Sequence, residues 1–312
     1  MYAWFGLFAG LVGFLGGMWT LRHGLEPLAA GHLPAILNRL VKTPLRGLIT
    51  GTLVTALLQS SGAVTVITIG LVAAGTLAFP DSIGIILGAN IGTCVTTQII
   101  ALQLDALVLP CLVAGVFLTL TSRRLWHHIG ITLIGFGMIF MALKLMSLSL
   151  QPIGRSEWFR RLLLESSDNP WLAVLSGTVL TALVQSSSAT TALTIALASQ
   201  GLVDLSGAVG IVIGNNVGSC VTSVLASIGA PTAAKRVAAA HVLLNVLGAA
   251  AFMPILPYFT AFIQHTGGTP ALQVANAHTF FNIISSIAVL PVARPYAALI
   301  ERLVLDRKAP GR

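Results

Sequence analysis

Charged side chains are scarce in this chain, whose 312 residues include only 17 lysines and arginines and 9 aspartates and glutamates. A soluble domain of this length carries about three times that share of charge. The short alternating segments of a β-barrel are also missing. Long apolar runs such as residues 1–21 and 129–143 are present instead, and 55% of the residues are hydrophobic. This pattern predicts an all-α polytopic membrane protein.

Cysteine is also rare, and the basic residues form no single patch. Cys94, Cys111 and Cys220 lie within apolar segments, and none has the spacing of metal ligands, so the sequence predicts no disulfide framework and no cofactor. The net charge of +8 comes from basic residues placed between hydrophobic segments. That distribution favours the positive-inside rule over nucleic-acid binding.

The chain contains an internal duplication. Residues 44–101 align with residues 170–227 without a gap, at a constant offset of 126. A weaker match relates residues 10–18 to residues 130–138, so each unit begins with a hydrophobic helix. We therefore expect a first transport repeat in residues 1–122, a second repeat in residues 123–230, and C-terminal transmembrane helices with a short cytoplasmic tail in residues 231–312.

The apolar stretch from about residue 46 to 79 must fold back on itself. As one helix it would be about 50 Å long, whereas the hydrocarbon core of a bilayer is about 30 Å thick. Polar Gln59, Ser60 and Ser61 mark the turn of a helical hairpin, which is either re-entrant or spans twice. Either way the first unit crosses an odd number of times, so the second repeat is predicted to be inverted. The basic residues then place the N-terminus outside and the C-terminus in the cytoplasm of a cell (inner) membrane protein.

Polar residues recur at the same places in both halves. The run TALVQSSSAT, residues 181–190, answers TALLQSSGAV, residues 55–64. An isolated hydroxyl in a membrane usually bonds a neighbouring helix, but twin polar breaks predict a binding site near the midplane. A second element, GANIGTCVTT at residues 88–97 and GNNVGSCVTS at residues 214–223, either packs helices closely through its glycines or unwinds opposite the hairpin tip.

Neither polar element contains a charged residue. A proton-coupled carrier usually needs a titratable group in its path, whereas neutral oxygen ligands suit an alkali cation, and sodium is the usual choice. We expect an anion at this site to be held by helix dipoles, hydroxyl groups and bound cations, without a basic side chain.

Two further segments share the pattern A-H-x-x-x-N, at residues 240–245 and 277–282. The spacing puts histidine and asparagine on one face of a helix. An interhelical hydrogen bond is the favoured interpretation, and a part in a transport path or a proton relay is the alternative.

With these motifs the chain resembles the type II sodium/phosphate cotransporter family, specifically its bacterial members. The resemblance implies a transporter and not an enzyme, with sodium-coupled cotransport of inorganic phosphate by alternating access. It implies substrate or ion binding by Gln59, Ser60, Ser61, Thr65, Asn90, Thr93, Thr96, Gln185, Ser186, Ser187, Ser188, Thr191, Asn216, Ser219 and Thr222. Sodium would bind through Gln59, Ser60, Ser61, Gln185, Ser186 and Ser187.

The first motif departs from the family pattern, because Gly62 stands where a third serine is usual. The expected partners are phosphate, sodium and the lipid bilayer, with no nucleic acid. Many bacterial relatives carry a cytoplasmic domain that resembles the phosphate-regulatory protein PhoU. This sequence shows none, so we expect such a regulator to be a separate protein.

Three other functions remain to be weighed. The same fold could carry another oxyanion, such as arsenate, sulfate or a carboxylate. A non-transporting structural subunit would leave the duplicated polar residues without a role. An intramembrane serine hydrolase is disfavoured, because the serines lack a nucleophile elbow and no buried carboxylate orients His241 or His278.

Overall fold

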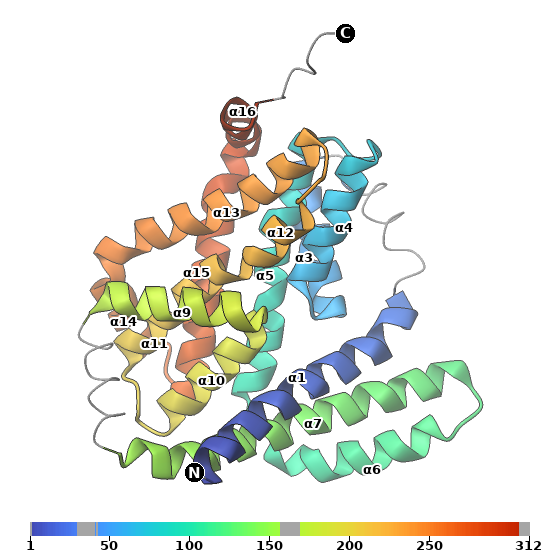
Figure 1. The fold of residues 1–312 in the computed structure, drawn as a ribbon, viewed down its shortest axis with the longest axis vertical. Coiled ribbons are helices and arrows are strands. Elements are labelled where there is room, and N and C mark those ends of the chain that lie inside the picture. The colour runs from blue at the N-terminus through green and yellow to red at the C-terminus, as the bar shows by residue number, and fades with distance from the viewer. Residues whose placement is uncertain (1, 30–40, 42, 157–168, 306–312) are drawn as a thin grey trace.

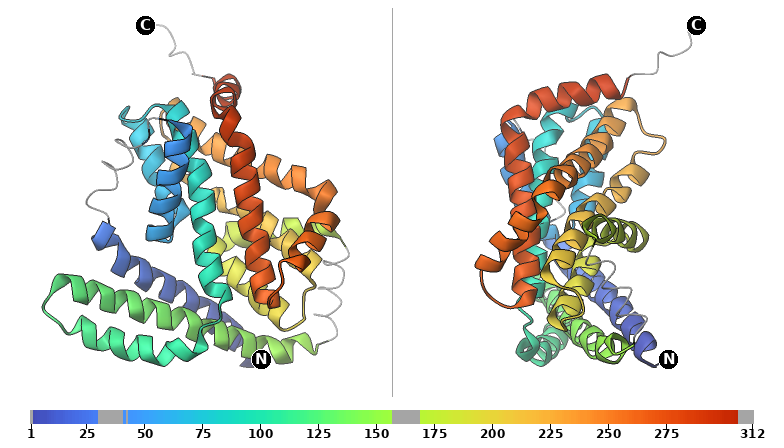
Figure 2. Two further views of the ribbon diagram at one scale, coloured as in Figure 1. Left: turned by 180° about the vertical axis from the view of Figure 1, so that it is seen from behind. Right: turned by 90° about the vertical axis from the view of Figure 1, so that its left-hand side faces the viewer.

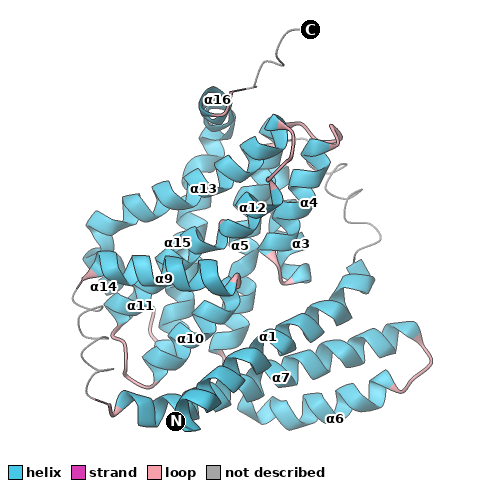
Figure 3. Ribbon diagram, in the orientation of Figure 1, coloured by secondary structure: helices cyan, strands magenta, loops and turns pink. Residues whose placement is uncertain are grey.

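A computed structural model describes residues 2–29, 41, 43–156 and 169–305, and every regular element in these ranges is a helix (Figure 3). The first repeat contains α1 (Tyr2–Ala29), α3 (Pro44–Leu58), α4 (Ser61–Ala73), α5 (Phe79–Ala101), η2 (Asp105–Leu107) and α6 (Val108–Thr119). The second repeat contains α7 (Arg124–Gly154), α9 (Pro170–Val184), α10 (Ser187–Ser199), α11 (Leu205–Ser219) and α12 (Val221–Ala226). The predicted tail beyond residue 305 lies outside the described residues.

The C-terminal region contains α13 (Thr232–Phe252), η3 (Met253–Ile255), α14 (Leu256–His265), α15 (Pro270–Val289), η4 (Leu290–Val292) and α16 (Ala293–Leu303). Six helices or helix pairs in the described residues are long and apolar enough to cross a bilayer. They are Tyr2–Leu28, Phe79–Ala101, Arg124–Gly154, Leu205–Ala226, Thr232–His265 and Pro270–Leu303. The prediction of an all-α polytopic membrane protein is confirmed.

Each hairpin turns at its glutamine, as the polar break predicts. Gln59 and Gln185 adopt left-handed backbone angles, with φ of 54° and 53°, and end α3 and α9. The next residues, Ser60 and Ser186, then cap α4 and α10, because each side-chain oxygen accepts a hydrogen bond from a backbone N–H three residues later. The two halves therefore build the same helix–turn–helix unit from the same residues.

The hairpin helices are too short to span a bilayer. At 1.5 Å per residue, the 15 residues of α3 and the 13 of α4 extend about 22 Å and 20 Å, against about 30 Å of hydrocarbon. Helix α5 begins beside the start of α3, since Gly84 lies against Pro44 and Gly47. The chain has thus returned to the side from which α3 started, as either kind of hairpin requires, and the short length of both helices favours the re-entrant alternative.

One expectation about the second polar element is wrong. Residues 88–97 do not unwind, because α5 runs unbroken from Phe79 to Ala101. Its glycines instead let the backbones of α3 and α5 approach, and a Cβ atom at Gly88 would collide with the carbonyl oxygen of Leu48. In the second copy the interruption is limited to Cys220, between α11 and α12. Close packing, the alternative interpretation, explains the glycines.

The first helices of the two repeats, α1 and α7, pack side by side and run antiparallel (Figures 1 and 2). Glycines of α1 lie against α7 residues in reversed order, Gly10 against Met146, Gly17 against Ile139 and Gly24 against Thr132. An inverted repeat requires antiparallel first helices. The inversion of the whole unit across a bilayer stays a prediction.

The C-terminal region repeats its own pattern. Helix α13, the 3-10 turn η3 and α14 are followed, 37 residues later, by α15, η4 and α16. A proline, Pro254 or Pro291, lies in each 3-10 turn, where the missing N–H breaks the helix. Each long helix, α13 and α15, carries one A-H-x-x-x-N pattern. These helices pack against the polar elements of the two repeats.

Candidate functional site

The tips of both hairpins line one central cavity of about 450 Å³. Helices from both repeats and from the C-terminal region surround it, so residues far apart in sequence meet there. The polar and charged side chains of its wall are Arg22, Glu26, Gln59, Ser60, Ser61, Thr65, Thr93, Gln185, Ser186, Ser187, Ser188, Ser219, Thr222, Ser223 and His241.

The backbone at each tip offers both kinds of hydrogen-bonding group. Helices α4 and α10 begin at Ser61 and Ser187, so their N-termini lie at the cavity, whereas α3 and α9 end at its other edge. A helix N-terminus presents unpaired N–H groups and partial positive charge, which suits an anion. A helix C-terminus presents carbonyl oxygens, which suit a cation.

The side chain and the backbone of Gln59 are both fixed. Its Oε1 accepts a hydrogen bond from Thr96 Oγ1 at 2.6 Å, and its Nε2 donates to the carbonyl of Ala56. Its own carbonyl oxygen accepts a hydrogen bond from Arg22 Nε at 3.0 Å. The first tip is therefore tied to α5 on one side and to α1 on the other.

Arg22 places a basic side chain on the cavity wall, although neither polar element of the sequence contains one. It lies on α1, distant in sequence from both polar elements, and the fold brings it to the cavity wall with Glu26. Among the described residues no acidic side chain forms an ion pair with Arg22. A guanidinium that donates through Nε keeps two NH₂ groups, which match the oxygens of phosphate or another oxyanion.

The cavity brings together eleven of the fifteen residues predicted for the site, all except Asn90, Thr96, Thr191 and Asn216. These four support neighbouring structure. Asn90 Nδ2 donates to Asn245 Oδ1 at 3.1 Å, and Asn216 Nδ2 donates to the Val212 carbonyl at 3.0 Å. The predicted binding roles of all fifteen residues stay predictions.

The two A-H-x-x-x-N helices form the expected interhelical hydrogen bonds. His241 Nδ1 shares a hydrogen bond with Ser223 Oγ at 3.0 Å, and His278 Nδ1 shares one with Thr97 Oγ1 at 3.2 Å. Ser223 and Thr97 occupy equivalent positions in the two repeats, so each histidine supports one repeat. His241 also lines the central cavity, whereas His278 does not.

Gly62, the departure from the family pattern, lies at a contact between the repeats. A Cβ atom placed there would lie 3.3 Å from Thr222 Cγ2 on α12. A serine would therefore require Thr222 to move. Its counterpart Ser188 is buried at the other tip. At this position the first tip packs closely against the second repeat, whereas the second tip carries a hydroxyl group at the equivalent position.

Sequence reasoning missed Arg22, Glu26, Ser223 and His241 as parts of the cavity wall. The signal for Arg22 was its position inside the long apolar helix Tyr2–Ala29, because a charged residue within a membrane segment indicates a functional role. His241 was noticed for its motif, but nothing in the sequence placed it beside the hairpin tips.

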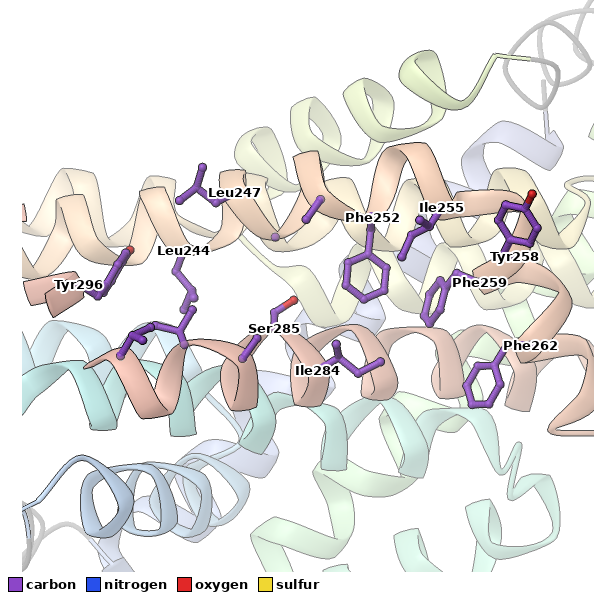
Figure 4. Close-up of a pocket in the computed structure, with 15 residues that line it drawn as sticks. Leu244, Leu247, Phe252, Ile255, Tyr258, Phe259, Phe262, Ile284, Ser285 and Tyr296 are labelled. Carbon is purple, nitrogen blue, oxygen red and sulfur yellow. The ribbon is translucent and has the colours of Figure 1, made fainter. Parts of the chain in front are cut away.

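A larger cavity of about 690 Å³ lies between the helices of the C-terminal region (Figure 4). Its wall is almost entirely apolar, with Phe252, Phe259 and Phe262 at one end and Tyr296 at the other. It contains no charged side chain and shares no residue with the central cavity. A wall of this composition cannot hold a multiply charged anion, so the smaller polar cavity is the candidate site.

Comparison with known proteins agrees with the duplicated architecture. The sequence profile of the Na⁺/Pi-cotransporter family matches the chain twice, at residues 14–148 and 148–264. The uncharacterized protein YqeW of Bacillus subtilis is 36% identical over 83% of this chain and 84% of its own length. The "Putative inorganic phosphate export protein YjbB" of Salmonella typhimurium is 29% identical over 77% of this chain, which spans 44% of that relative.

A shorter match joins the chain to an animal protein. The "Sodium-dependent phosphate transport protein 2A" of Ovis aries is 46% identical over 66 residues, which are 21% of this chain and 10% of that relative. No solved structure matches the chain. The family profile covers most of the sequence and YqeW is similar over most of both chains, so this chain belongs to the Na⁺/Pi-cotransporter family, a family of transporters and not of enzymes.

Proposed function

We propose that this protein is a secondary transporter that couples the movement of inorganic phosphate to sodium ions by alternating access at the central cavity. The observation that carries the proposal is the meeting of both hairpin tips in one polar cavity that Arg22 also lines. The site is pseudo-symmetric, and it offers ligands for an anion and for cations within the same wall.

Phosphate is supported by the donors at the cavity. Two helix N-termini, several serine hydroxyls and the Arg22 guanidinium all donate hydrogen bonds to anionic oxygens. Two of the similar proteins carry phosphate transport or export in their names. The polar donors surround the cavity, as recognition of a tetrahedral anion requires.

Sodium is supported by the neutral oxygens at the same wall. Gln59, Gln185 and the serines supply amide and hydroxyl oxygens, and the carbonyl ends of α3 and α9 lie at the same tips. Unwound or terminal carbonyls near a membrane midplane coordinate sodium in many carriers. One similar protein is named for sodium-dependent transport and another for export, so flux should be measured in both directions.

Alternating access is supported by polar cavities on both sides of an apolar layer. A small cavity of about 200 Å³ shares Gln59 with the central cavity and is otherwise lined mainly by apolar side chains. It shares Ile100 and Phe140 with a third cavity of about 350 Å³, whose wall includes Lys144 and Asp105. The apolar layer would be the closed gate of this conformation, and the third cavity the vestibule beyond it.

The test is radiolabelled phosphate uptake into proteoliposomes. An inward sodium gradient should drive accumulation, and a potassium gradient of equal size should not. Gln185→Ala and Ser187→Ala should abolish uptake because they remove cavity ligands. Ser176→Ala, on the same hairpin but outside the cavity wall, should keep it. Accumulation that ignores sodium would contradict the coupling.

Competition by unlabelled anions identifies the substrate. Phosphate should compete far better than sulfate or a carboxylate, whereas arsenate shares its shape and charge and should compete strongly. Stronger competition by sulfate would assign the site to another oxyanion. Normal uptake after both Gln-Ser-Ser clusters are replaced by alanine would contradict a role for the cavity altogether.

A further inference from the structure

One buried amide links three helices of the second repeat. Thr181 Oγ1 donates a hydrogen bond to Asn215 Oδ1 at 2.6 Å, and Asn215 Nδ2 donates to Thr191 Oγ1 at 2.6 Å and to the Ser187 carbonyl at 3.0 Å. Thr181 belongs to α9, Thr191 and Ser187 to α10, and Asn215 to α11. A single side chain therefore satisfies both arms of the hairpin.

The first repeat keeps the oxygens of this arrangement but not the amide. At the offset of 126, Thr55, Ser61 and Thr65 correspond to Thr181, Ser187 and Thr191, and Ala89 stands in place of Asn215. Thr55 and Thr65 are 0% and 2% exposed. Neither hydroxyl forms a hydrogen bond with another described residue.

Two buried hydroxyls without partners are unusual in a native protein, because an unpaired polar group loses its hydration on burial. The local backbone is the same in both repeats, with the same left-handed glutamine and the same serine cap. The difference therefore comes from position 89. In the second repeat, the Thr191 hydroxyl and the Ser187 carbonyl accept from the amide NH₂ group of Asn215, and the Thr181 hydroxyl donates to its amide oxygen.

We propose that a sodium ion binds in the first repeat between the hydroxyl oxygens of Thr55 and Thr65 and the carbonyl oxygen of Ser61. This ion takes the place that the Asn215 carboxamide group occupies in the second repeat, so the second repeat has no ion at the equivalent position. The inference deepens the proposed function, since it rests on sodium coupling and assigns one coupling ion to named atoms.

The ligand chemistry suits sodium. All three atoms are neutral oxygens, the donor set that hard monovalent cations accept, and no thiol or imidazole belongs to it. Thr65 also lines the central cavity, so the ion has a route from the substrate site. The side chain of asparagine exceeds that of alanine by one carboxamide group, whose volume is comparable to that of one small ion or one water molecule.

The position would link sodium to phosphate. Ser61 is the first residue of α4, whose N-terminus faces the cavity, and Thr55 lies in the last turn of α3. An ion held by both arms fixes the separation of the two helices at the tip. The N–H groups of α4 and the Ser60 hydroxyl are then in place for the anion, so phosphate affinity should rise with sodium.

The two repeats supply a matched pair of variants. Ala89→Asn should place the missing amide in the first repeat and exclude the ion. We expect the sodium activation curve of phosphate uptake to become less steep, and sodium-dependent thermal stabilisation of the purified protein to shrink, with potassium as the control salt. Thr55→Val, which removes one ligand and little volume, should raise the sodium concentration for half-maximal uptake about tenfold.

Thr181→Val is the control in the second repeat, and it should leave the sodium response unchanged because the Asn215 carboxamide already occupies the equivalent position. If Ala89→Asn and Thr55→Val both keep the wild-type sodium response, the position holds water only and the inference is wrong. If Ala89→Asn fails to fold, Thr55→Val decides alone. A wild-type protein whose uptake ignores sodium would overturn the proposed coupling itself, which is a different result.

Discussion

Arg22 Nε donates a hydrogen bond to the carbonyl oxygen of Gln59 at 3.0 Å, across 37 positions of sequence. The bond joins α1 to the residue at which the first hairpin turns. Gln59 has a left-handed backbone and ends α3, so its carbonyl is one that the helix leaves unpaired. Arg22 thus satisfies the tip and puts a positive charge on the cavity wall.

Replacing Arg22 should weaken phosphate binding. Arg22→Gln removes the charge and the paired donors, and a charge-assisted hydrogen bond is worth about 1.5 to 3 kcal/mol, so the KM for phosphate should rise at least about tenfold. Arg22→Lys should be intermediate, because lysine keeps the charge but not the planar pair of donors. Initial uptake rates at saturating sodium measure this.

Arg124→Gln, at the exposed start of α7, is the control for the loss of one positive charge. It should leave the KM for phosphate unchanged. An Arg22→Gln protein with the wild-type KM would show that Arg22 has only a structural role.

Gly62→Ser should impair uptake although it restores the family's third serine. The added Cβ would lie 3.3 Å from Thr222 Cγ2, so the first tip and α12 must move apart. The double variant Gly62→Ser with Thr222→Ser removes that methyl group, keeps the hydroxyl and should recover uptake. Parallel uptake assays of the wild type and the two variants check this, and a double variant no better than Gly62→Ser would exclude the steric explanation.

Gly88→Ala should destabilise the protein. Its Cβ would collide with the Leu48 carbonyl of α3, and overpacking of this kind costs about 1 to 3 kcal/mol. Gly70→Ala is a matched control on α4, because a Cβ there meets nothing within 4 Å and alanine is the better helix former. Size-exclusion profiles after heating should show a lower midpoint temperature for Gly88→Ala alone, and equal midpoints would refute the packing argument.

Phe140→Ala should open the apolar layer between the central cavity and the vestibule. Phe140 is 1% exposed and lines both the small apolar cavity and the third cavity. Removing the ring should let phosphate leak down its own gradient without sodium. Efflux from preloaded proteoliposomes in sodium-free buffer measures the leak.

Phe140→Leu should leak less, because leucine keeps most of the apolar volume. Phe117→Ala, on the exposed face of α6, should not leak at all. Tight vesicles with Phe140→Ala would show that the gate lies elsewhere.

The hairpins could be predicted because polar glutamine and serine interrupt an apolar run that is too long for one membrane crossing. The duplication also showed the same interruption twice. It could not decide whether the glycines of residues 88–97 unwind or pack, since both uses need small residues. Only the positions of α3 and α5 answer that question. The place of Arg22 on the cavity wall could not be predicted, because counting charges along the sequence ignores the tertiary fold. The role of Asn215 could not be predicted. The two copies differ there by one residue, and only the structure shows which groups its side chain contacts.

The contact between α1 and α7 differs in kind from the contact between α1 and the first hairpin. Glycines at positions 10, 17 and 24 bring the α1 backbone directly against α7, so the two helices would move as one rigid body. The bond from Arg22 to Gln59 joins that body to the hairpin tip through a long, flexible side chain. A phosphate ion held by the two NH₂ groups would share the guanidinium with the Gln59 carbonyl. The charge that recruits phosphate would then also attach the hairpin tip to its support while the substrate is bound.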